Sequence, residues 1–443
     1  MTERLSILAA AREAGAMPGV RIGERNYTYA DLAALTVARL DALRNEGHGS
    51  GPYPVVGTNT LDTVVTLYAL LEAGIPALMI HPRLTEAERA DLLSIAERAG
   101  APHPGAAAIL FTSGTTGNPR GAVLTREALL ASAAASAASL GWEDGDCWLL
   151  CMPIARVGGL SILTRCLAAR RCVALATAFD AQAFPAWIDE QRITLASVVP
   201  TMLTRVLDLH PDWRAPAHLR AVQVGGDTAS DKLLARAVER GLPIVITYGL
   251  TESCSQVCLT PYAERHQPAA CGAGKPLPGV ELRISDIGHI ELRGPMLMAG
   301  YWDAPPLASG EWFDTGDLGT LDASGCLHVH ARRADLIVTG GENAYPAEIE
   351  RALEAIPGIA AAGVFGIPNE EWGQRVAAAL VAEGTPPTDA TLYASVRSQL
   401  APHKRPRLIG YVDRLPQTAG GKLDRAALGE TVRNLRPLTS GAG

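Results

Sequence analysis

The stretch at residues 108–125, AILFTSGTTGNPRGAVLT, decides the fold. Two apolar runs, Ala108–Phe111 and Ala122–Leu124, predict short strands on either side of a loop. Hydroxyl side chains and glycines make up that loop: Thr112, Ser113, Gly114, Thr115, Thr116 and Gly117. Glycine allows positive φ, so successive N–H groups can point into one cavity, and the hydroxyls add donors. The stretch predicts a polyphosphate-binding loop without the Gly-Lys-Ser/Thr ending of a Walker loop; a plain glycine-rich turn is the alternative.

Length and composition indicate a multidomain protein. At 443 residues, two or three domains are expected. Hydrophobic residues make up 48%, and the net charge of -7 argues against a nucleic-acid binder. The chain shows no signal-peptide pattern, no apolar run long enough to span a bilayer, and no metal-ligand spacing among its eight cysteines. We therefore expect a cytoplasmic protein with reduced core thiols.

The order of periodic segments predicts an α/β architecture. Val20–Tyr27 has hairpin character, and Thr28 is a candidate cap for a helix over Tyr29–Asn45. Strand and helix patterns then alternate as far as residue 247, which predicts a large N-terminal domain of parallel-rich sheets flanked by helices. Short strands over Gly279–Leu292 predict a small β subdomain. From Tyr345 onward, helices and strands predict a small α+β domain.

Several polar residues stand where ligands bind in such sheets. Gly225, Gly226 and Asp227 follow a predicted strand, where the glycines could let an adenine ring approach the backbone or could form a tight turn. Asp317, expected on a turn, could accept both hydroxyls of a ribose, although aspartate is also common in turns.

Five ordered motifs resemble those of the adenylate-forming superfamily, which includes acyl-CoA synthetases, nonribosomal-peptide adenylation domains and luciferases. They are the loop at 112–117, YGLTESCSQ at 248–256, WFDTGDLG at 312–319, RRADLIVTGGEN at 332–343 and LPQTAGGKLDR at 415–425. The resemblance implies that ATP and CoA are co-substrates and that Mg²⁺ is required. It implies nucleotide-binding roles for the loop and for Gly226, Asp227, Tyr248, Gly249, Asp317 and Arg332. Within this set Tyr248 would face the adenine, and Asp317 and Arg332 would contact the ribose.

The same resemblance implies catalytic roles for Thr251, Glu252 and Lys422. Thr251 would contact a phosphate, Glu252 would hold the metal, and Lys422 would neutralise charge as a carboxylate attacks the α-phosphate. Gly340 and Gly341 would line a pantetheine tunnel.

The resemblance also divides the chain. The N-terminal domain would span residues 1–333, and a mobile C-terminal domain carrying the catalytic lysine would span residues 334–443. The hinge would lie at Ala334, where the family more often has Asp or Lys. Oligomeric state is not given by these motifs, although a homodimer is common in such enzymes.

The sequence near residues 199–203, 248–256 and 340–346 most resembles that of 2-succinylbenzoate–CoA ligases of menaquinone biosynthesis. Arg156, Thr201, Gly225 and Ser253 are the candidate substrate-binding residues. Ala155 and Arg156 depart from the family's aromatic–histidine pair, and Arg156 could either bind a second substrate carboxylate or form a surface ion pair. Another aryl- or fatty-acyl-CoA ligase, an enzyme that loads a carrier protein, and a silent nucleotide-binding homologue are the alternatives.

A basic cluster near the C-terminus could attract the phosphates of CoA, or it could be a solvated edge: His403, Lys404, Arg405 and Arg407.

Overall fold

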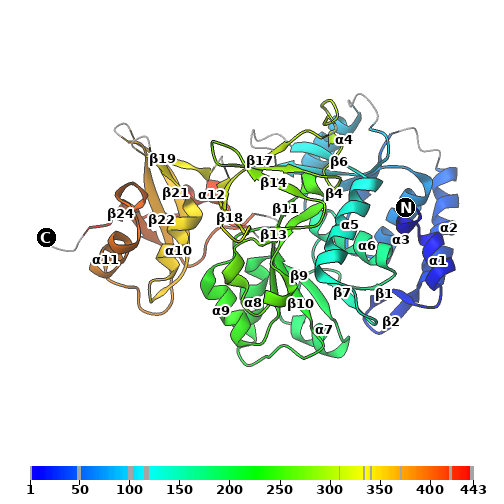
Figure 1. The fold of residues 1–443 in the computed structure, drawn as a ribbon, viewed down its shortest axis with the longest axis horizontal. Helices are drawn as coiled ribbons and strands as arrows, with labels where there is room; N and C mark the ends of the chain where they lie inside the picture. Colours follow the sequence, from blue (N-terminus) through cyan, green and yellow to red (C-terminus); the bar gives the residue numbers. More distant parts are fainter. Residues whose placement is uncertain are drawn as a thin grey trace.

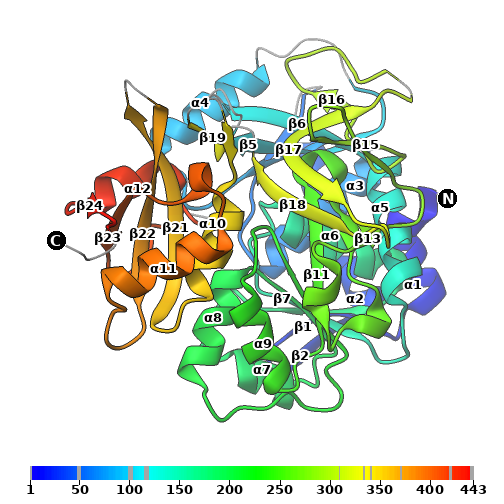
Figure 2. The same ribbon diagram turned by 60° about the vertical axis from the view of Figure 1, so that its left-hand side comes forward.

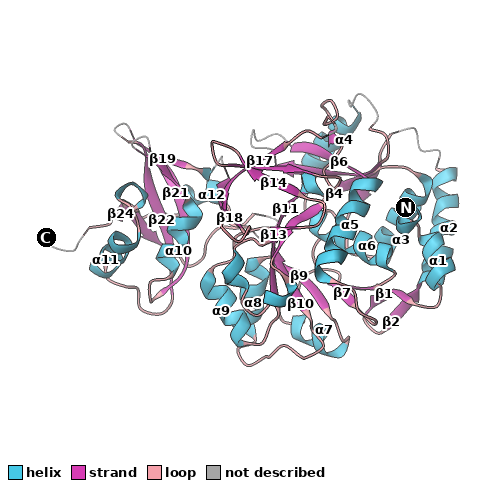
Figure 3. Cartoon of the chain, viewed as in Figure 1, coloured by secondary structure: helices cyan, strands magenta, loops and turns pink. Residues whose placement is uncertain are grey.

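The computed structural model describes residues 2–46, 51–97, 103–113, 119–308, 310–332, 335–339, 342–369, 372–418 and 422–439. Figure 1 shows a large body that contains the N-terminus and a smaller body, coloured yellow to red, that ends in the C-terminus. Strands lie between helices in both bodies (Figure 3). This architecture agrees with the predicted large α/β part and small α+β part.

A nine-stranded sheet forms the centre of the large body, in the order β13-β12-β11-β10-β9-β7-β8-β1-β2. Its inner strands, from β11 to β1, pair in parallel, whereas β2, β12 and β13 are antiparallel. The strands are β1 (Pro18–Ile22), β2 (Arg25–Thr28), β7 (Cys147–Leu150), β8 (Cys172–Leu175), β9 (Leu195–Val198), β10 (Ala221–Gly225), β11 (Ile244–Leu250), β12 (Ser255–Leu259) and β13 (Lys275–Pro276).

A five-stranded sheet in the order β16-β6-β5-β4-β3 contains the phosphate-loop hairpin. Strands β3 to β5 are parallel, and β6 and β16 are antiparallel. The strands are β3 (Tyr53–Val56), β4 (Ala77–Ile80), β5 (Ala106–Ser113), β6 (Pro119–Thr125) and β16 (Gly300–Tyr301). One hydrophobic core joins both sheets to α3 (Leu61–Ala73), α5 (Arg126–Leu140) and α6 (Val157–Ala169). The two sheets are therefore held by a shared layer of helices.

Helix α6 was not predicted, although it is the most buried of these helices. Nine of its residues are buried, among them Leu160 and Ile162. Two glycines, Gly158 and Gly159, stand in its first turn, and glycine is a poor helix former. Burial of the apolar face outweighs this weak propensity.

Helices α7 (Phe184–Glu190), α8 (Pro200–Leu209) and α9 (Asp231–Glu239) cover the other face of the nine-stranded sheet (Figure 1). The remaining N-terminal helices are α1 (Ile7–Ala14), α2 (Tyr29–Asn45) and α4 (Glu86–Glu97). The predicted cap of α2 is confirmed: Thr28 accepts a bond from Asp31 N, and Asp31 accepts one from Thr28 N in return. Among the described helices, none has both the length and the hydropathy that crossing a membrane requires.

The small β subdomain is an antiparallel sheet in the order β14-β15-β17-β18. Its strands are β14 (Glu281–Ile284), β15 (His289–Arg293), β17 (Phe313–Leu321) and β18 (Leu327–Arg332). Asp317 lies in the middle of β17, so the expectation that it stands on a turn is wrong. The preceding Gly316 has φ of 72°, and this local turn-like geometry lies inside an otherwise paired strand.

The C-terminal body has its own sheet, in which β20-β19-β22-β23-β24 follow one another and β21 also pairs with β22 (Figure 2). Its elements are β19 (Ile337–Thr339), β20 (Glu342–Ala344), α10 (Pro346–Glu354), β21 (Ile359–Asn369), β22 (Gly373–Ala382), α11 (Asp389–Gln399), β23 (Leu408–Tyr411), α12 (Arg425–Thr431) and β24 (Arg436–Pro437). Separate hydrophobic clusters, built around Leu353 and Leu428, stabilise it. The predicted boundary at residues 333 and 334 lies outside the described residues and stays a prediction.

The expectation of reduced thiols is wrong for two of the eight cysteines. Cys271 and Cys326 form a disulfide, because the 3₁₀ turn over Pro268–Cys271 packs beside the segment before β18 and brings the two Cα atoms to 5.3 Å. Their sequence separation of 55 residues hid this proximity. The other six cysteines are unpaired and buried, as predicted.

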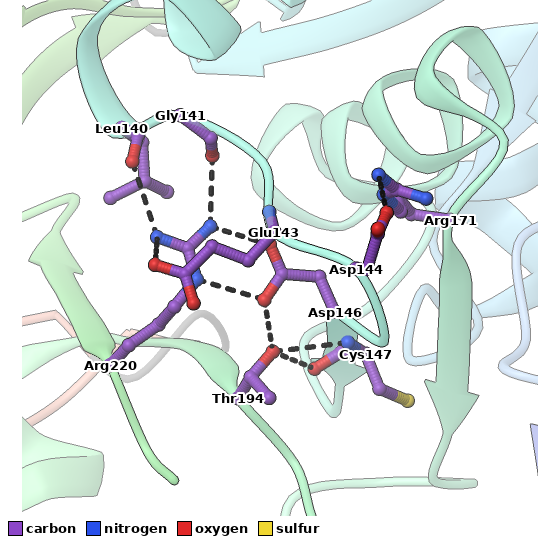
Figure 4. A network of polar contacts seen from close by, with 9 residues as sticks. All are labelled: Leu140, Gly141, Glu143, Asp144, Asp146, Cys147, Arg171, Thr194 and Arg220. Carbon is purple, nitrogen blue, oxygen red and sulfur yellow. Dashed lines mark hydrogen bonds and ion pairs between the residues drawn. The ribbon is translucent and has the colours of Figure 1, made fainter.

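A buried ion pair connects the amino-terminal ends of neighbouring strands in the nine-stranded sheet (Figure 4). Asp146, just before β7, accepts bonds from Nε and Nη2 of Arg220, just before β10, at 2.8 and 2.5 Å. Thr194, just before β9, donates its hydroxyl to the same carboxylate at 2.7 Å. The Asp146 and Arg220 side chains are 1% and 9% exposed. The network fixes the relative positions of three neighbouring strands.

Candidate active site

The carboxyl ends of β10 and β11 bring the first predicted residues together. Gly225 pairs with Thr247, which places Gly226 beside Tyr248. A Cβ at Gly225 would lie 2.5 Å from Cγ2 of Thr247, so no side chain fits there. The packing of two strands therefore explains Gly225 without a ligand. Gly226 has φ of 82°, a value that favours glycine at the strand-to-helix turn.

Three residues with predicted nucleoside contacts come together on β11, β17 and β18. The hydroxyl of Tyr248 donates to Oδ2 of Asp317 at 2.7 Å, across 69 positions of sequence. Burial raises the pKa of Tyr248 well above its usual value, and the charge of Asp317 raises it further. Asp317 in turn is the cross-strand partner of Arg332. Sheet pairing thus brings the three predicted residues to one end of the β subdomain.

Glu252 lies in the short 3₁₀ turn Thr251–Ser253 that follows β11. Its Oε1 atom accepts a bond from the hydroxyl of Tyr301 at 3.0 Å, and its backbone oxygen accepts one from Met298 N at 2.7 Å. The guanidinium of Arg120 lies over the Tyr301 ring, 3.4 Å from its centroid. Sequence analysis did not predict Tyr301 or Arg120 as site residues. Arg120 could have been found from the sequence, because it is the basic residue that follows the glycine-rich loop. Tyr301 could not, because it lies outside the five motifs.

The glycine-rich loop joins two strands, β5 and β6, as predicted, and these strands pair antiparallel. Thr112 is the last residue but one of β5, and its hydroxyl lies 3.5 Å from the backbone oxygen of Arg120. Ser113, the last residue, pairs with Pro119. The loop's own Gly114, Thr115, Thr116 and Gly117 lie outside the described residues, and so do Ala334, Gly340 and Gly341. Their predicted roles stay predictions.

The loop that carries Lys422 reaches across from the C-terminal body to the end of β10. A Cβ at Gly226 would lie 3.8 Å from Cε of Lys422. Asp227 Oδ2 accepts a bond from the backbone N–H of Leu423 at 3.2 Å, across 196 positions of sequence. The structure therefore brings the predicted catalytic lysine to the predicted nucleotide site.

Three other predicted residues have packing or turn-forming contacts. A Cβ at Gly249 would lie 1.9 Å from the backbone oxygen of Ser255, so glycine is needed for β11 and β12 to pair. Ser253 is fully buried, and its hydroxyl bonds backbone atoms of Leu250 and Ser255. Thr201 is the second residue of α8 and is partly exposed. Contacts of Thr201 and Ser253 with substrate, and of Gly249 with the nucleotide, stay predictions.

The basic cluster before β23 is partly used by the protein itself. Lys404 pairs with Glu348 at 2.8 Å, and Arg405 donates from Nε to the backbone oxygen of Leu400 at 2.8 Å. These two side chains therefore make contacts within the protein, and attraction of CoA phosphates by the cluster stays a prediction.

The described residues suit a cation that binds together with a phosphate ligand. No group of three or more His, Cys, Asp or Glu side chains in the described part of the chain could hold a metal ion by itself. Mg²⁺ is usually bound by one or two carboxylates together with substrate phosphates, so a single Glu252 near a phosphate loop fits it.

Comparisons with known proteins agree with this arrangement. Residues 96–302 match the AMP-binding enzyme family, and residues 348–422 match the AMP-binding enzyme C-terminal domain. A 2-succinylbenzoate–CoA ligase of Bacillus cereus (strain AH820) is 33% identical over 463 residues, which cover 94% of this chain and 96% of the relative.

Solved structures of o-succinylbenzoate CoA synthetase are also similar to this chain. The o-succinylbenzoate CoA synthetase from Bacillus subtilis in complex with its acyl-adenylate intermediate is 28% identical, with a TM-score of 0.86 and 98% of each chain covered. The same synthetase with ATP and magnesium ion is 28% identical, with a TM-score of 0.85, covering 96% of this chain and 98% of that one. This protein belongs to the AMP-binding enzyme family, the adenylate-forming superfamily that its motifs predict.

Proposed function

We propose that this protein is an AMP-forming acid–thiol ligase that converts 2-succinylbenzoate, ATP and CoA into 2-succinylbenzoyl-CoA, AMP and pyrophosphate in menaquinone biosynthesis. The observation that carries the proposal is the meeting of Lys422 with Gly226 beside the Tyr248–Asp317 pair. Similarity over nearly the whole chain to 2-succinylbenzoate–CoA ligases supports the substrate.

The placement of these side chains supports the proposed first half-reaction. A substrate carboxylate oxygen forms a bond to the α-phosphorus of ATP, the bond to the pyrophosphate oxygen breaks, and acyl-AMP and pyrophosphate result. Tyr248, Asp317 and Arg332 hold the nucleoside, and the ammonium of Lys422 stabilises the charge that develops at the α-phosphate. Glu252 holds Mg²⁺, which neutralises charge on the phosphates.

In the second half-reaction the thiol of CoA attacks the acyl carbon and AMP leaves with the electron pair of the broken bond. Division of the reaction into two steps through a mixed anhydride lowers each barrier. Between the two steps, the C-terminal domain (residues 334–443) would rotate about Ala334. This rotation would move Lys422 out of the site and bring in Gly340 and Gly341, which would line the pantetheine tunnel. Because ATP and CoA are the co-substrates, we also propose a cytoplasmic location, and a homodimer stays a prediction.

Pyrophosphate release with ATP and Mg²⁺ tests the proposal directly. We expect release with 2-succinylbenzoate and much less with benzoate or a medium-chain fatty acid, followed by thioester formation with free CoA. Release with one of the other acids alone would show a different acyl-CoA ligase. Acyl-adenylate formation without transfer to free CoA would indicate a carrier-protein acceptor, and ATP binding without any acid-dependent release would indicate a silent homologue.

A further inference from the structure

His81 is a buried histidine whose hydrogen bonding is incomplete. It follows β4 directly and is 6% exposed. Its Nδ1 atom accepts a bond from the backbone N–H of Arg83 at 3.2 Å, so the ring proton of the neutral imidazole is on Nε2. Nε2 is buried and has no hydrogen-bond partner among the described residues. A buried donor of this kind is costly unless a ligand completes it.

Arg156 is one of two arginines whose charges act on the imidazole of His81. Burial, together with the nearby charges of Arg156 and Arg83, lowers the pKa of His81 to about 4, so the ring is neutral at physiological pH. Arg156 is itself accessible to solvent, yet desolvation by the surrounding protein lowers its pKa. Arg156 caps α6 without a side-chain hydrogen bond, so the positive end of that helix lies at the same place.

The strand registers place this pair beside the phosphate loop. β4 and β5 run parallel with Met79 opposite Leu110, so His81 lies level with Thr112 on the next strand, one strand spacing (about 4.8 Å) away. On the other side, the backbone N–H of Gly57 donates to the oxygen of Ile80 at 2.9 Å.

Contacts of Gly57 and Asn59 connect this strand edge to Arg156. A Cβ at Gly57 would lie 2.7 Å from the backbone nitrogen of Ala155, so the two backbones are in direct contact. The amide of Asn59 bonds Met152 O and Ile154 N at 3.0 Å each and anchors the loop that presents Arg156. The position of both polar groups is therefore set by the fold.

We propose that Nε2–H of His81 and the guanidinium of Arg156 together bind the second, non-reacting carboxylate of a dicarboxylic acid substrate. This inference rests on the proposed function and adds a specificity-determining residue, His81, that no motif indicated. A neutral N–H donor and a permanent cation match one carboxylate, which can accept several bonds. The reacting carboxylate is a poorer candidate, because a guanidinium and an N–H bound to it would weaken it as a nucleophile.

The test compares two acids that differ only in this carboxylate: 2-succinylbenzoate and 4-oxo-4-phenylbutanoate. Rates of pyrophosphate release give kcat/KM for each acid in the wild type and in His81→Phe, His81→Gln, Arg156→Met and, as the control, His218→Gln. His218 is a partly exposed histidine that bonds the backbone oxygen of Ile188 on the far face of the sheet. Thermal melting confirms that each variant is folded.

We expect His81→Phe to lower kcat/KM for 2-succinylbenzoate by about 10- to 100-fold, the usual effect of a lost hydrogen bond to a charged group. The value for 4-oxo-4-phenylbutanoate should not change. His81→Gln keeps an N–H donor and should restore part of the preference for 2-succinylbenzoate. Arg156→Met should lower kcat/KM for 2-succinylbenzoate at least as much as His81→Phe does. The control His218→Gln should have the same kcat/KM values as the wild type.

Two results would overturn the inference while the proposed function stands: an unchanged preference in His81→Phe and Arg156→Met, or an equal loss for both acids. If the wild type itself released no pyrophosphate with 2-succinylbenzoate, the proposed function would fail and this inference with it.

Discussion

At the scale of single residues, the hydroxyl of Tyr301 positions the carboxylate of Glu252. Groups that orient a metal ligand typically affect metal affinity or activity by about 10- to 100-fold. We therefore expect Tyr301→Phe to raise the Mg²⁺ concentration needed for half-maximal pyrophosphate release by about tenfold. Activity at saturating Mg²⁺ should largely recover, because Glu252 itself remains. Titration of the rate with Mg²⁺ measures the effect.

Tyr53→Phe is a matched control, because the hydroxyl of Tyr53 also donates to a glutamate, Glu46, at 2.9 Å. That pair lies between α2 and β3, away from the site. An equal response of both variants to Mg²⁺, or no response of Tyr301→Phe, would contradict a positioning role for Tyr301.

At the scale of elements, the ion pair of Asp146 and Arg220 holds the starts of β7 and β10 together. Loss of one partner of a buried pair leaves an uncompensated charge, so we expect Asp146→Asn to lower the free energy of unfolding by about 3–5 kcal/mol. Urea unfolding at neutral pH measures this. Asp144→Asn is the control: Asp144 pairs with Arg171 at 3.1 Å but is fully exposed, and such surface pairs contribute little to stability (Figure 4). Similar losses in the two variants would refute the argument.

The same pair predicts a dependence of stability on pH. Burial alone would raise the pKa of Asp146, but hydrogen bonds from Arg220, Glu143 N and Thr194, with the charge of Arg220, lower it overall. A carboxyl whose pKa is lower in the folded state stabilises the fold above its unfolded pKa, about 3.9 for aspartate. That contribution is lost as the pH falls below this value through the lower native pKa. The difference in stability between wild type and Asp146→Asn should therefore shrink under strongly acidic conditions.

At the scale of the whole molecule, contacts between the two bodies hold Lys422 at the predicted nucleotide site. Besides the bond between Asp227 and Leu423, Lys232 of α9 pairs with Glu383, and Arg205 donates to Gln417 at 3.1 Å. The arrangement in which Lys422 reaches Gly226 is the one that the proposed role of Lys422 in acyl-adenylate formation requires.

We expect Lys422→Ala to slow acyl-adenylate formation by about 10²- to 10³-fold, as removal of a preorganised charge usually does. Thioester formation from supplied acyl-adenylate should be retained, because Lys422 would leave the site for that step. Separate assays of the two half-reactions measure this, with the exposed Lys275 changed to Ala as the control. Equal loss of both half-reactions would disprove the assignment.

Much of this architecture was predictable because local patterns are strong where one face of an element is buried. The helix over Tyr29–Asn45, its Thr28 cap and the two strands beside the glycine-rich loop were all predicted from residues close together in the chain. Helix α6 was not, because its glycine-containing first turn is stabilised by burial between two sheets rather than by propensity. The disulfide was missed for the same kind of reason, since its cysteines meet only through packing.

The sequence by itself determined the chemistry of this protein, because the functional groups of each motif lie within a few residues of one another and indicate the ligand that they suit. Only the tertiary structure decided which groups meet: Tyr248 with Asp317, and Tyr301 with Glu252. Each of these pairs joins strands or turns that are distant in the chain. Their contacts depend on sheet order and register, which arise from the packing of the whole core and from no short stretch of residues.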